Sequence, residues 1–335
     1  MGKLVGSRGV AAVLAMALAA MPLAAKADSA RDFFKGKVIT YVVATSPGGG
    51  YDTYGRLIAR FMQKAMPGTK IIVRNVPGGG NVVGANTIYA AKPDGLTIGI
   101  FNTGLLFLQL LKDKSIQFDL TKMSWIGTAA SDTRVLVLRK DLGITKPEQL
   151  FKASAPRLKL YCSGAGSASY YDAKTVVYAL HMNAELLTGY SGSEGAMSMM
   201  RHEADGTIGS ESSDRQFVQN VHGVFVMEIG GAPGSKLPQA EAYARTEDGK
   251  KLLAIVAAES RISRLTVGPP GIAPDRLAVL RQGFAKALAD PELLAQAKKM
   301  GIPIGPIDGD TTARIVHDAL NQSPQNVALL TQAVK

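Results

Sequence analysis

Three glycine-rich or small-residue turns hold most of the residue types in this chain that could bind a ligand. They are Ser46-Pro47-Gly48-Gly49-Gly50, Pro77-Gly78-Gly79-Gly80 and the stretch from Ser163 to Ser169. Each turn follows an apolar run and precedes a helical pattern, so each is predicted to join a strand to a helix. Free N–H groups at helix starts, together with nearby hydroxyls, can hold a carboxylate. A plain chain reversal is the alternative use of glycine here, and we favour the binding interpretation.

None of these turns matches a phosphate-binding motif. The fingerprint Gly-x-Gly-x-x-Gly fails because Thr53, Val83 and Ser169 stand at its last position, and no Gly-Lys-Ser/Thr follows any turn. The run Gly189-Tyr190-Ser191-Gly192-Ser193 resembles a nucleophile elbow up to its last residue, where Ser replaces Gly. A serine hydrolase that uses Ser191 or Ser193 with one of the four histidines therefore stays open as an alternative.

Metal and cofactor chemistry find little support in the composition. The 335 residues include four His and one Cys, and His202-Glu203 lacks the second His that a zinc-binding helix needs. We therefore predict no cofactor and no metal. The lone Cys162 has no intrachain partner and is predicted to be a small buried residue.

Strands and helices alternate along the chain and must position these turns. Apolar runs at 37–43, 70–74 and 97–101 each lead through a turn into a helix, which predicts a parallel sheet covered by helices. A second block repeats this layout, with strands at 134–138, 158–162 and 207–210 and a helix at 170–182. Later segments predict strands at 252–256 and 265–267, helices at 275–288 and after Asp290, and a helical tail at 310–334.

The order of these elements predicts an α/β protein with two lobes. The chain leaves its first sheet near Ala130 and returns to it near Leu265. We therefore expect residues 28–130 and 265–335 to form a discontinuous first lobe and residues 131–264 to form the second. Each lobe is expected to hold a mixed, mainly parallel sheet flanked by helices, and crossover strands are expected to join the two.

The N-terminal segment predicts export. Lys3 and Arg8 precede an apolar run from Val10 to Leu23, and Ala25-Lys26-Ala27 supplies a signal-peptidase site. The run is shorter than the roughly 20 residues that span a bilayer, so we expect residues 1–27 to be cleaved after Ala27 and the protein to enter the periplasm. The net charge is +11, but Lys and Arg are scattered along the chain, which argues against a nucleic-acid surface.

The glycine turns and their surroundings resemble the extracytoplasmic solute receptors of tripartite tricarboxylate transporters. The resemblance rests on Ser46-Pro47-Gly48-Gly49-Gly50-Tyr51-Asp52, on Asn75-Val76-Pro77-Gly78-Gly79-Gly80-Asn81 and on Ala91-Lys92-Pro93-Asp94-Gly95. It runs from about Asp32 to the C-terminus and is densest over residues 38–104. The resemblance implies a two-lobe periplasmic binding protein, similar to type II, that closes on a small carboxylic acid and delivers it to membrane permease subunits.

The resemblance also implies a set of ligand-binding residues. On the first lobe they are Pro47, Gly48, Gly49, Asp52, Asn102, Thr103 and Gly104, with Asp52 expected to order the loop rather than to contact an anion. On the second lobe they are Ser163, Gly164, Ser167, Ser169, Tyr190, Ser193 and Glu211. Tyr51 is expected beside the ligand together with Tyr170 and Tyr190, or else packed at the hinge.

The class of ligand stays open at this level. Glu211 would repel a second carboxylate, so a zwitterion, an amide-bearing acid or a monocarboxylate competes with a dicarboxylate, and the tyrosines admit an aromatic acid. A sensory receptor that docks on a signalling partner is an alternative to transport. We expect a monomer, because one pair of lobes suffices for closure.

Overall fold

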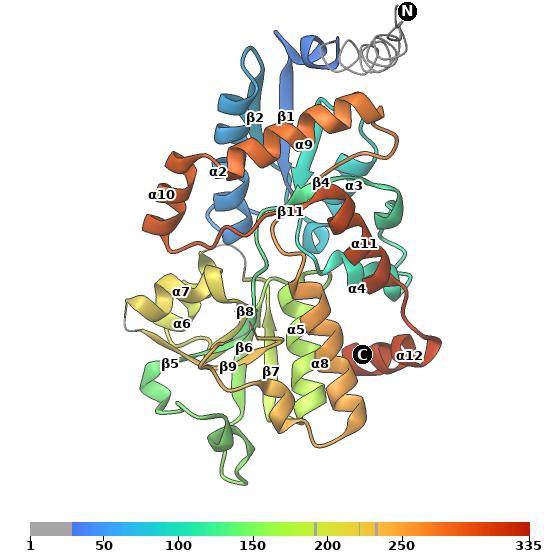
Figure 1. The fold of residues 1–335 in the computed structure, drawn as a ribbon. Coiled ribbons are helices and arrows are strands. Elements are labelled where there is room, and N and C mark those ends of the chain that lie inside the picture. Colours follow the sequence, from blue (N-terminus) through green and yellow to red (C-terminus); the bar gives the residue numbers. More distant parts are fainter. Residues whose placement is uncertain (1–28, 191–192, 221, 232–233) are drawn as a thin grey trace, which may run out of the picture.

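The computed structural model describes residues 29–190, 193–220, 222–231 and 234–335. The expected signal peptide, residues 1–27, lies outside this part of the chain, and so do Ser191 and Gly192 of the serine-rich turn. The described chain forms two halves, one above the other, and each half is built around its own sheet (Figure 1).

The upper half holds a six-stranded mixed sheet with the strand order β11-β4-β10-β3-β1-β2. β1 pairs in parallel with β2 and β3, whereas β10 pairs antiparallel with β3 and β4. The strands are β1 (Val38–Val43), β2 (Lys70–Asn75), β3 (Thr97–Ile100), β4 (Ser124–Thr128), β10 (Leu265–Gly268) and β11 (Ile307–Asp308). The helices are α2 (Gly50–Ala65), α3 (Val82–Tyr89), α4 (Leu105–Leu110), α9 (Pro274–Leu288), α10 (Pro291–Met300) and α11 (Gly309–Leu320). α2 packs against α9, and α11 packs against β4.

The lower half holds a five-stranded mixed sheet with the order β7-β6-β8-β5-β9. β6 pairs in parallel with β7 and β8, and β5 pairs antiparallel with β8 and β9. The strands are β5 (Arg134–Arg139), β6 (Leu158–Cys162), β7 (Ala184–Thr188), β8 (Gly206–Ser210) and β9 (Gly223–Ile229). The helices are α5 (Ala168–Leu180), α6 (Glu194–Met200), α7 (Glu211–Gln219), α8 (Glu247–Ser260) and α12 (Pro324–Val334). These two helix-flanked sheets confirm the predicted two-lobe α/β fold. The sheets are mixed, as expected, but the expectation that they are mainly parallel was wrong: among the described strands, five of the nine pairings are antiparallel, because β5 and β10, which the chain enters from the other half, run antiparallel to their neighbours.

Three segments of the chain pass between the halves, and two of them lie side by side; the third, residues 321–323, leads from α11 to α12. The first connects β4 to β5, and the second connects α8 to β10. The Ala129 N–H donates to the Arg264 carbonyl at 3.0 Å, and the Asp132 N–H donates to the Ser260 carbonyl at 3.3 Å. Because few backbone hydrogen bonds hold this narrow pair of segments, it is the natural place for a hinge.

Two expectations about the C-terminal part were wrong. Residues 252–256 lie inside helix α8 and not in a strand, because Thr246 caps a helix whose buried face includes Leu252, Leu253 and Val256. The helical tail is interrupted before Pro324, and α12 packs against α5 and α8 of the lower half. The last helix therefore lies with the second sheet, which corrects the expectation that all of residues 265–335 belong to the first lobe.

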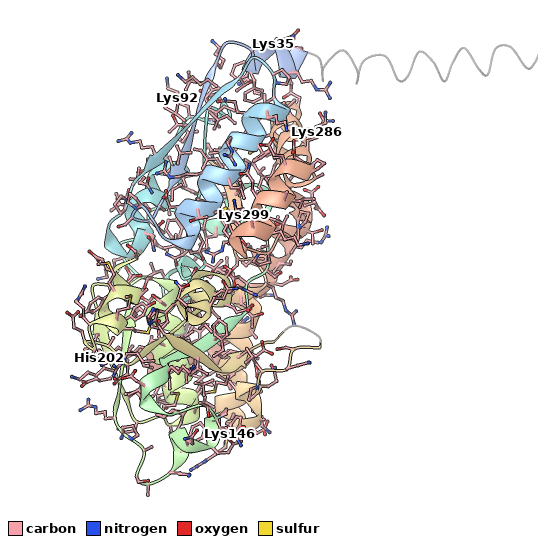
Figure 2. All side chains as sticks on the ribbon, turned by 90° about the vertical axis from the view of Figure 1, so that its left-hand side faces the viewer. Lys35, Lys92, Lys146, His202, Lys286 and Lys299 are labelled. Atoms are coloured by element: carbon pink, nitrogen blue, oxygen red, sulfur yellow. The ribbon has the colours of Figure 1, made fainter. Side chains whose placement is uncertain are left out.

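Lysines lie on both halves of the molecule. Figure 2 shows the labelled Lys35, Lys92, Lys286 and Lys299 along the upper half and Lys146 on the lower half. Within the described residues, no helix has the length and apolar character needed to cross a membrane.

Candidate functional site

A cavity of about 500 Å³ lies between the two sheets. This volume falls within the roughly 300–1,000 Å³ that is typical of small-molecule sites. The loops that follow β1, β2 and β3 form its upper wall, and β5, β6, β8 and the loops around them form its lower wall. The lining residues are Thr45, Ser46, Gly49–Tyr51, Pro77–Asn81 and Asn102 above, and Arg134, Tyr161, Ser163, Ser167–Ser169, Asp172, Tyr190, Thr207, Gly209, Ser210, Ser213 and Asp214 below.

Two backbone turns shape the upper wall. Helix α2 begins at Gly50, and no side chain caps it, so the N–H groups of its first turn have no partner within the helix. After β2, Gly78, Gly79 and Gly80 adopt φ values of 128°, 54° and 64°, and Asn81 follows at 81°. Glycine adopts these angles at little cost, which explains the second glycine turn. The glycines of the upper wall therefore present backbone donors, beside the side chains of Tyr51, Asn81 and Asn102.

Hydroxyl groups organise the lower wall at the start of α5. The Ser167 hydroxyl accepts from the Tyr170 N–H at 3.2 Å and donates to the Gly164 carbonyl at 2.8 Å. The Ser169 hydroxyl accepts from the Ser163 N–H at 3.1 Å. These bonds fix the turn that brings the N-terminus of α5, with its positive dipole end, to the cavity.

The two lobes touch beside the cavity through glycines and one asparagine. Asn102 Oδ1 accepts from the Gly104 N–H at 2.8 Å and, across the lobes, from the Ala168 N–H at 3.0 Å. A Cβ atom on Gly104 would lie 2.5 Å from the Ala168 Cα, and one on Gly80 would lie 2.7 Å from the Gly166 Cα. This close approach of the lobes is possible only without side chains at these glycines.

The buried side chain of Arg134, on the lower wall, binds residues of both lobes. Arg134 Nε donates to Asp172 at 2.7 Å, and its Nη2 donates to both carboxylate oxygens of Glu259 at 2.8 and 2.9 Å. The same Nη2 reaches the Thr103 hydroxyl of the upper lobe at 3.1 Å, and Nη1 donates to Ser210 at 2.9 Å. Arg134 is therefore fully engaged, and two carboxylates share its single charge.

A second buried ion pair lies at the crossover segments. Arg264 Nη2 contacts Asp132 Oδ2 at 2.5 Å and donates to the Ser212 and Ser213 hydroxyls at 2.9 and 3.0 Å. The guanidinium also stacks over the Tyr51 ring, with its carbon 4.5 Å from the ring centre. Tyr51 thus packs at the hinge and lines the cavity at once, so the two roles considered for it coincide.

Asp214 stands out among the lining residues because it is a buried acid without a basic partner. Its side chain accepts one hydrogen bond, from the Tyr161 hydroxyl at 3.3 Å, and the described residues form no ion pair with it. The residue is 7% exposed. Burial raises the pKa of Asp214 to about 7, and the nearby Asp132 adds to the shift.

Three lining residues hold polar atoms that lack a partner among the described residues. They are the Thr45 hydroxyl, the Tyr51 hydroxyl and Asp172 Oδ1, all of which are buried. Because a buried polar atom is costly when it makes no hydrogen bond, these atoms point to a polar occupant of the cavity.

The structure brings together seven of the residues that sequence reasoning selected. Gly49, Tyr51, Asn102, Ser163, Ser167, Ser169 and Tyr190 line the cavity. The other eight lie outside its lining: Pro47, Gly48, Asp52, Thr103, Gly104, Gly164, Ser193 and Glu211.

Several of these eight residues support the walls from behind. Asp52 accepts from the Gly48 N–H and from Arg56 Nε, each at 3.0 Å, and from Asn75 at 2.9 Å. Burial alone would raise the pKa of Asp52, but these hydrogen bonds outweigh it and lower the pKa. Asp52 therefore orders the first turn. Thr103 is buried and bonds to Arg134.

The remaining residues lie near the cavity for structural reasons. The Gly164 carbonyl accepts the Ser167 hydrogen bonds, and Gly104 makes the interlobe contact. Ser193 directly precedes α6. Glu211 begins α7, and its carboxylate pairs with Arg215 at 2.6 Å. The acidic residue that α7 contributes to the cavity is thus Asp214, three positions further along the helix.

Sequence reasoning missed Arg134, Asp172 and Asp214. A signal was available for each. Arg134 begins a strand whose next four residues are apolar, and both aspartates lie in the opening turns of helices that follow predicted strands. A charged residue at such a position is unusual enough to have been considered, since burying it requires a partner.

The histidines offer no general base to this cavity. His181, His202, His222 and His317 are all exposed, and none of them lines it. Figure 2 shows His202 at the outer surface of the lower half. In the described part of the chain, no group of three His, Cys, Asp or Glu side chains could hold a metal ion.

Comparisons with known proteins agree with this fold. A curated relative from Pseudomonas sp. (strain P51), a UPF0065 protein in the tcbD-tcbE intergenic region, is 28% identical over 85% of both chains. The solved periplasmic binding protein BugD shares 20% identity with a TM-score of 0.72 and covers 89% of this chain and 97% of its own.

MatC from Rhodopseudomonas palustris, solved with bound malate, shares 17% identity with a TM-score of 0.70 and covers 89% of this chain and 99% of its own. These structures support a two-lobe binding-protein fold. The sequence profile of the tripartite tricarboxylate transporter family receptor matches residues 55–330. The chain therefore belongs to the tripartite tricarboxylate transporter receptor family, whose members are periplasmic solute-binding proteins.

Proposed function

We propose that this protein captures a small organic acid in the interlobe cavity and delivers it to membrane permease subunits without catalysing a reaction. The observation that carries the proposal is the cavity itself, where uncapped helix α2 and the start of α5 meet from opposite lobes. Helix N-termini and hydroxyls favour a carboxylate, and the malate in MatC is an acid of this kind.

Closure of the two lobes would supply the transport signal. In this proposal, residues 28–130 and 265–320 move as one lobe against residues 131–264 and α12, with the paired crossover segments as the hinge. Ligand bound between the lobes stabilises the closed form because it contacts both walls. A permease can then recognise the closed shape. The proposal includes cleavage after Ala27 and a monomeric receptor.

A melting-temperature screen tests this function. Mature protein would be heated with mono-, di- and aromatic carboxylates and with amino acids. A ligand at about 100 times its Kd adds about 2.7 kcal/mol of stability, which raises the Tm measurably. A rise in Tm that only acids produce supports the proposal. If the starting protein is free of bound ligand and no compound in the panel raises its Tm, the proposal is contradicted. Labelling of Ser193 or Ser191 by a serine-reactive probe would favour the hydrolase alternative.

A further inference from the structure

Buried acidic side chains outnumber buried basic ones around the cavity. Six ionisable side chains, each less than 9% exposed, lie in or next to the lower wall and the hinge: the acids Asp132, Asp172, Asp214 and Glu259 and the bases Arg134 and Arg264. Arg134 binds Asp172 and Glu259, and Arg264 binds Asp132 through Nη2. The Nε and Nη1 of Arg264 have no hydrogen-bond partner among the described residues, but this guanidinium lies over the Tyr51 and Tyr54 rings and is not a lining residue of the cavity. Asp214 forms no ion pair with the described residues.

The carboxyl groups in excess lie where a ligand would sit. Asp172 and Asp214 both line the cavity, and Arg134 is the one Lys or Arg residue among the described residues that line it. Asp172 Oδ1 is buried and accepts no hydrogen bond from the described residues. A ligand with two carboxylates would bring a second carboxylate to this wall, where Arg134 already binds Asp172 and Glu259.

From this arrangement we infer that the cargo is an amino-bearing carboxylic acid, whose carboxylate binds the backbone donors of the upper wall and whose ammonium group binds Asp214 and Asp172. The inference rests on the proposed receptor function and narrows the class of ligand. An ammonium group supplies the hydrogen-bond donors and the positive charge that the two carboxylates lack.

The ionisation of Asp214 gives this inference a pH signature. Its neighbours are the Tyr161 hydroxyl from β6, Asp132 and Arg134 from the β5 side, and Arg264 from the start of β10. In the ligand-free protein burial favours the protonated carboxyl, and an ammonium ion favours the carboxylate. Binding below pH 7 must therefore release a proton, and affinity should rise with pH up to about 7 and then level off.

Matched ligand pairs test the inference without any variant. Titration calorimetry at pH 7.5 would compare propanoate with alanine, butanoate with 4-aminobutanoate, and succinate with aspartate. In at least one pair, the amino member is expected to bind about 10-fold tighter or more, because charge-assisted hydrogen bonds replace unpaired carboxylate oxygens. Titration at pH 6 in buffers of different ionisation enthalpy should show proton release.

The variant Asp214→Asn keeps the shape of the side chain and removes its charge. It should abolish the preference for the amino member and the proton release, whereas Asp318→Asn on the exposed face of α11 should change neither. Equal or tighter binding of the plain acids, or affinity that falls as pH rises, would overturn the inference and leave the receptor function standing. If no member of any pair binds but another acid raises the Tm, the inference fails and the receptor function stands; if no acid raises the Tm either, the receptor function fails with it.

Discussion

Closure of the two lobes depends on Gly104, and the substitution Gly104→Ala tests this dependence. Gly104 has φ −57° and ψ −18°, so its backbone accepts alanine without strain. The new Cβ would lie 2.5 Å from the Ala168 Cα of the other lobe. Ordinary carbon–carbon contact begins near 3.5 Å, so the lobes would have to separate by about 1 Å at this point.

That separation has a calculable consequence. The hydrogen bond from the Ala168 N–H to Asn102 Oδ1, now 3.0 Å long, would stretch to about 4 Å and be lost. One such bond contributes about 1 kcal/mol, so the closed form should weaken by at least that amount and Kd should rise about 5-fold or more.

Titration calorimetry with an acid that raises the Tm would measure the change, and solution scattering would show a more open shape with ligand. Gly305→Ala is the matched control, because a Cβ there meets no atom within 4 Å. Wild-type affinity and compaction in Gly104→Ala would refute the reasoning.

Three further predictions follow from the buried groups. Arg134→Met strands Asp172 and Glu259 without their cation, so chemical denaturation at pH 7.5 should show a loss of about 3–5 kcal/mol of unfolding free energy, and exposed Arg157→Met should lose much less; equal losses would contradict the ion-pair account. The folded-state pKa of Asp214 is raised from 3.8 to about 7, so the folded protein binds the proton more tightly and the ligand-free protein should lose stability as pH rises from about 4 to 7. Asp214→Asn should make that part of the curve less steep, although Asp172 and Glu259, whose pKa values burial also raises, still contribute to it; an unchanged slope would refute the assignment. Cys162 is buried with its pKa raised to about 11 by burial, so a thiol reagent at pH 8 should label it only after unfolding, and rapid labelling of native protein would be inconsistent with the fold.

Much of the fold could be predicted because its strands are short apolar runs bounded by glycine turns. The strands that became β1, β2, β3, β5 and β6 were predicted within one or two residues, since local pattern decides them. The segment 252–256 could not be assigned in the same way, because a short apolar run fits a buried helix as well as a strand. The position of α12 depends on packing across the lobes, which no local pattern records.

The backbone turns of the site could be predicted from the sequence, but the charged side chains that line it could not. The turns at Gly49 and Ser167 could be predicted from their glycine- and serine-rich composition, and both line the cavity. Asp214 and Glu211 lie in the same first turn of α7, and sequence alone does not tell which one faces inward. Arg134 gathers partners from α5, α8 and the loop after β3, so its role appears only when the chain is folded.

The central claim is that one small acid binds between the two lobes, and a calorimetric titration of the mature protein with the best acid from the melting screen tests it most directly. We predict one molecule bound per chain, with binding abolished by Ser163→Trp, which places a large ring on the cavity wall. Saturable binding that survives this substitution unchanged, or the absence of binding by any acid to folded, ligand-free protein, would contradict the account.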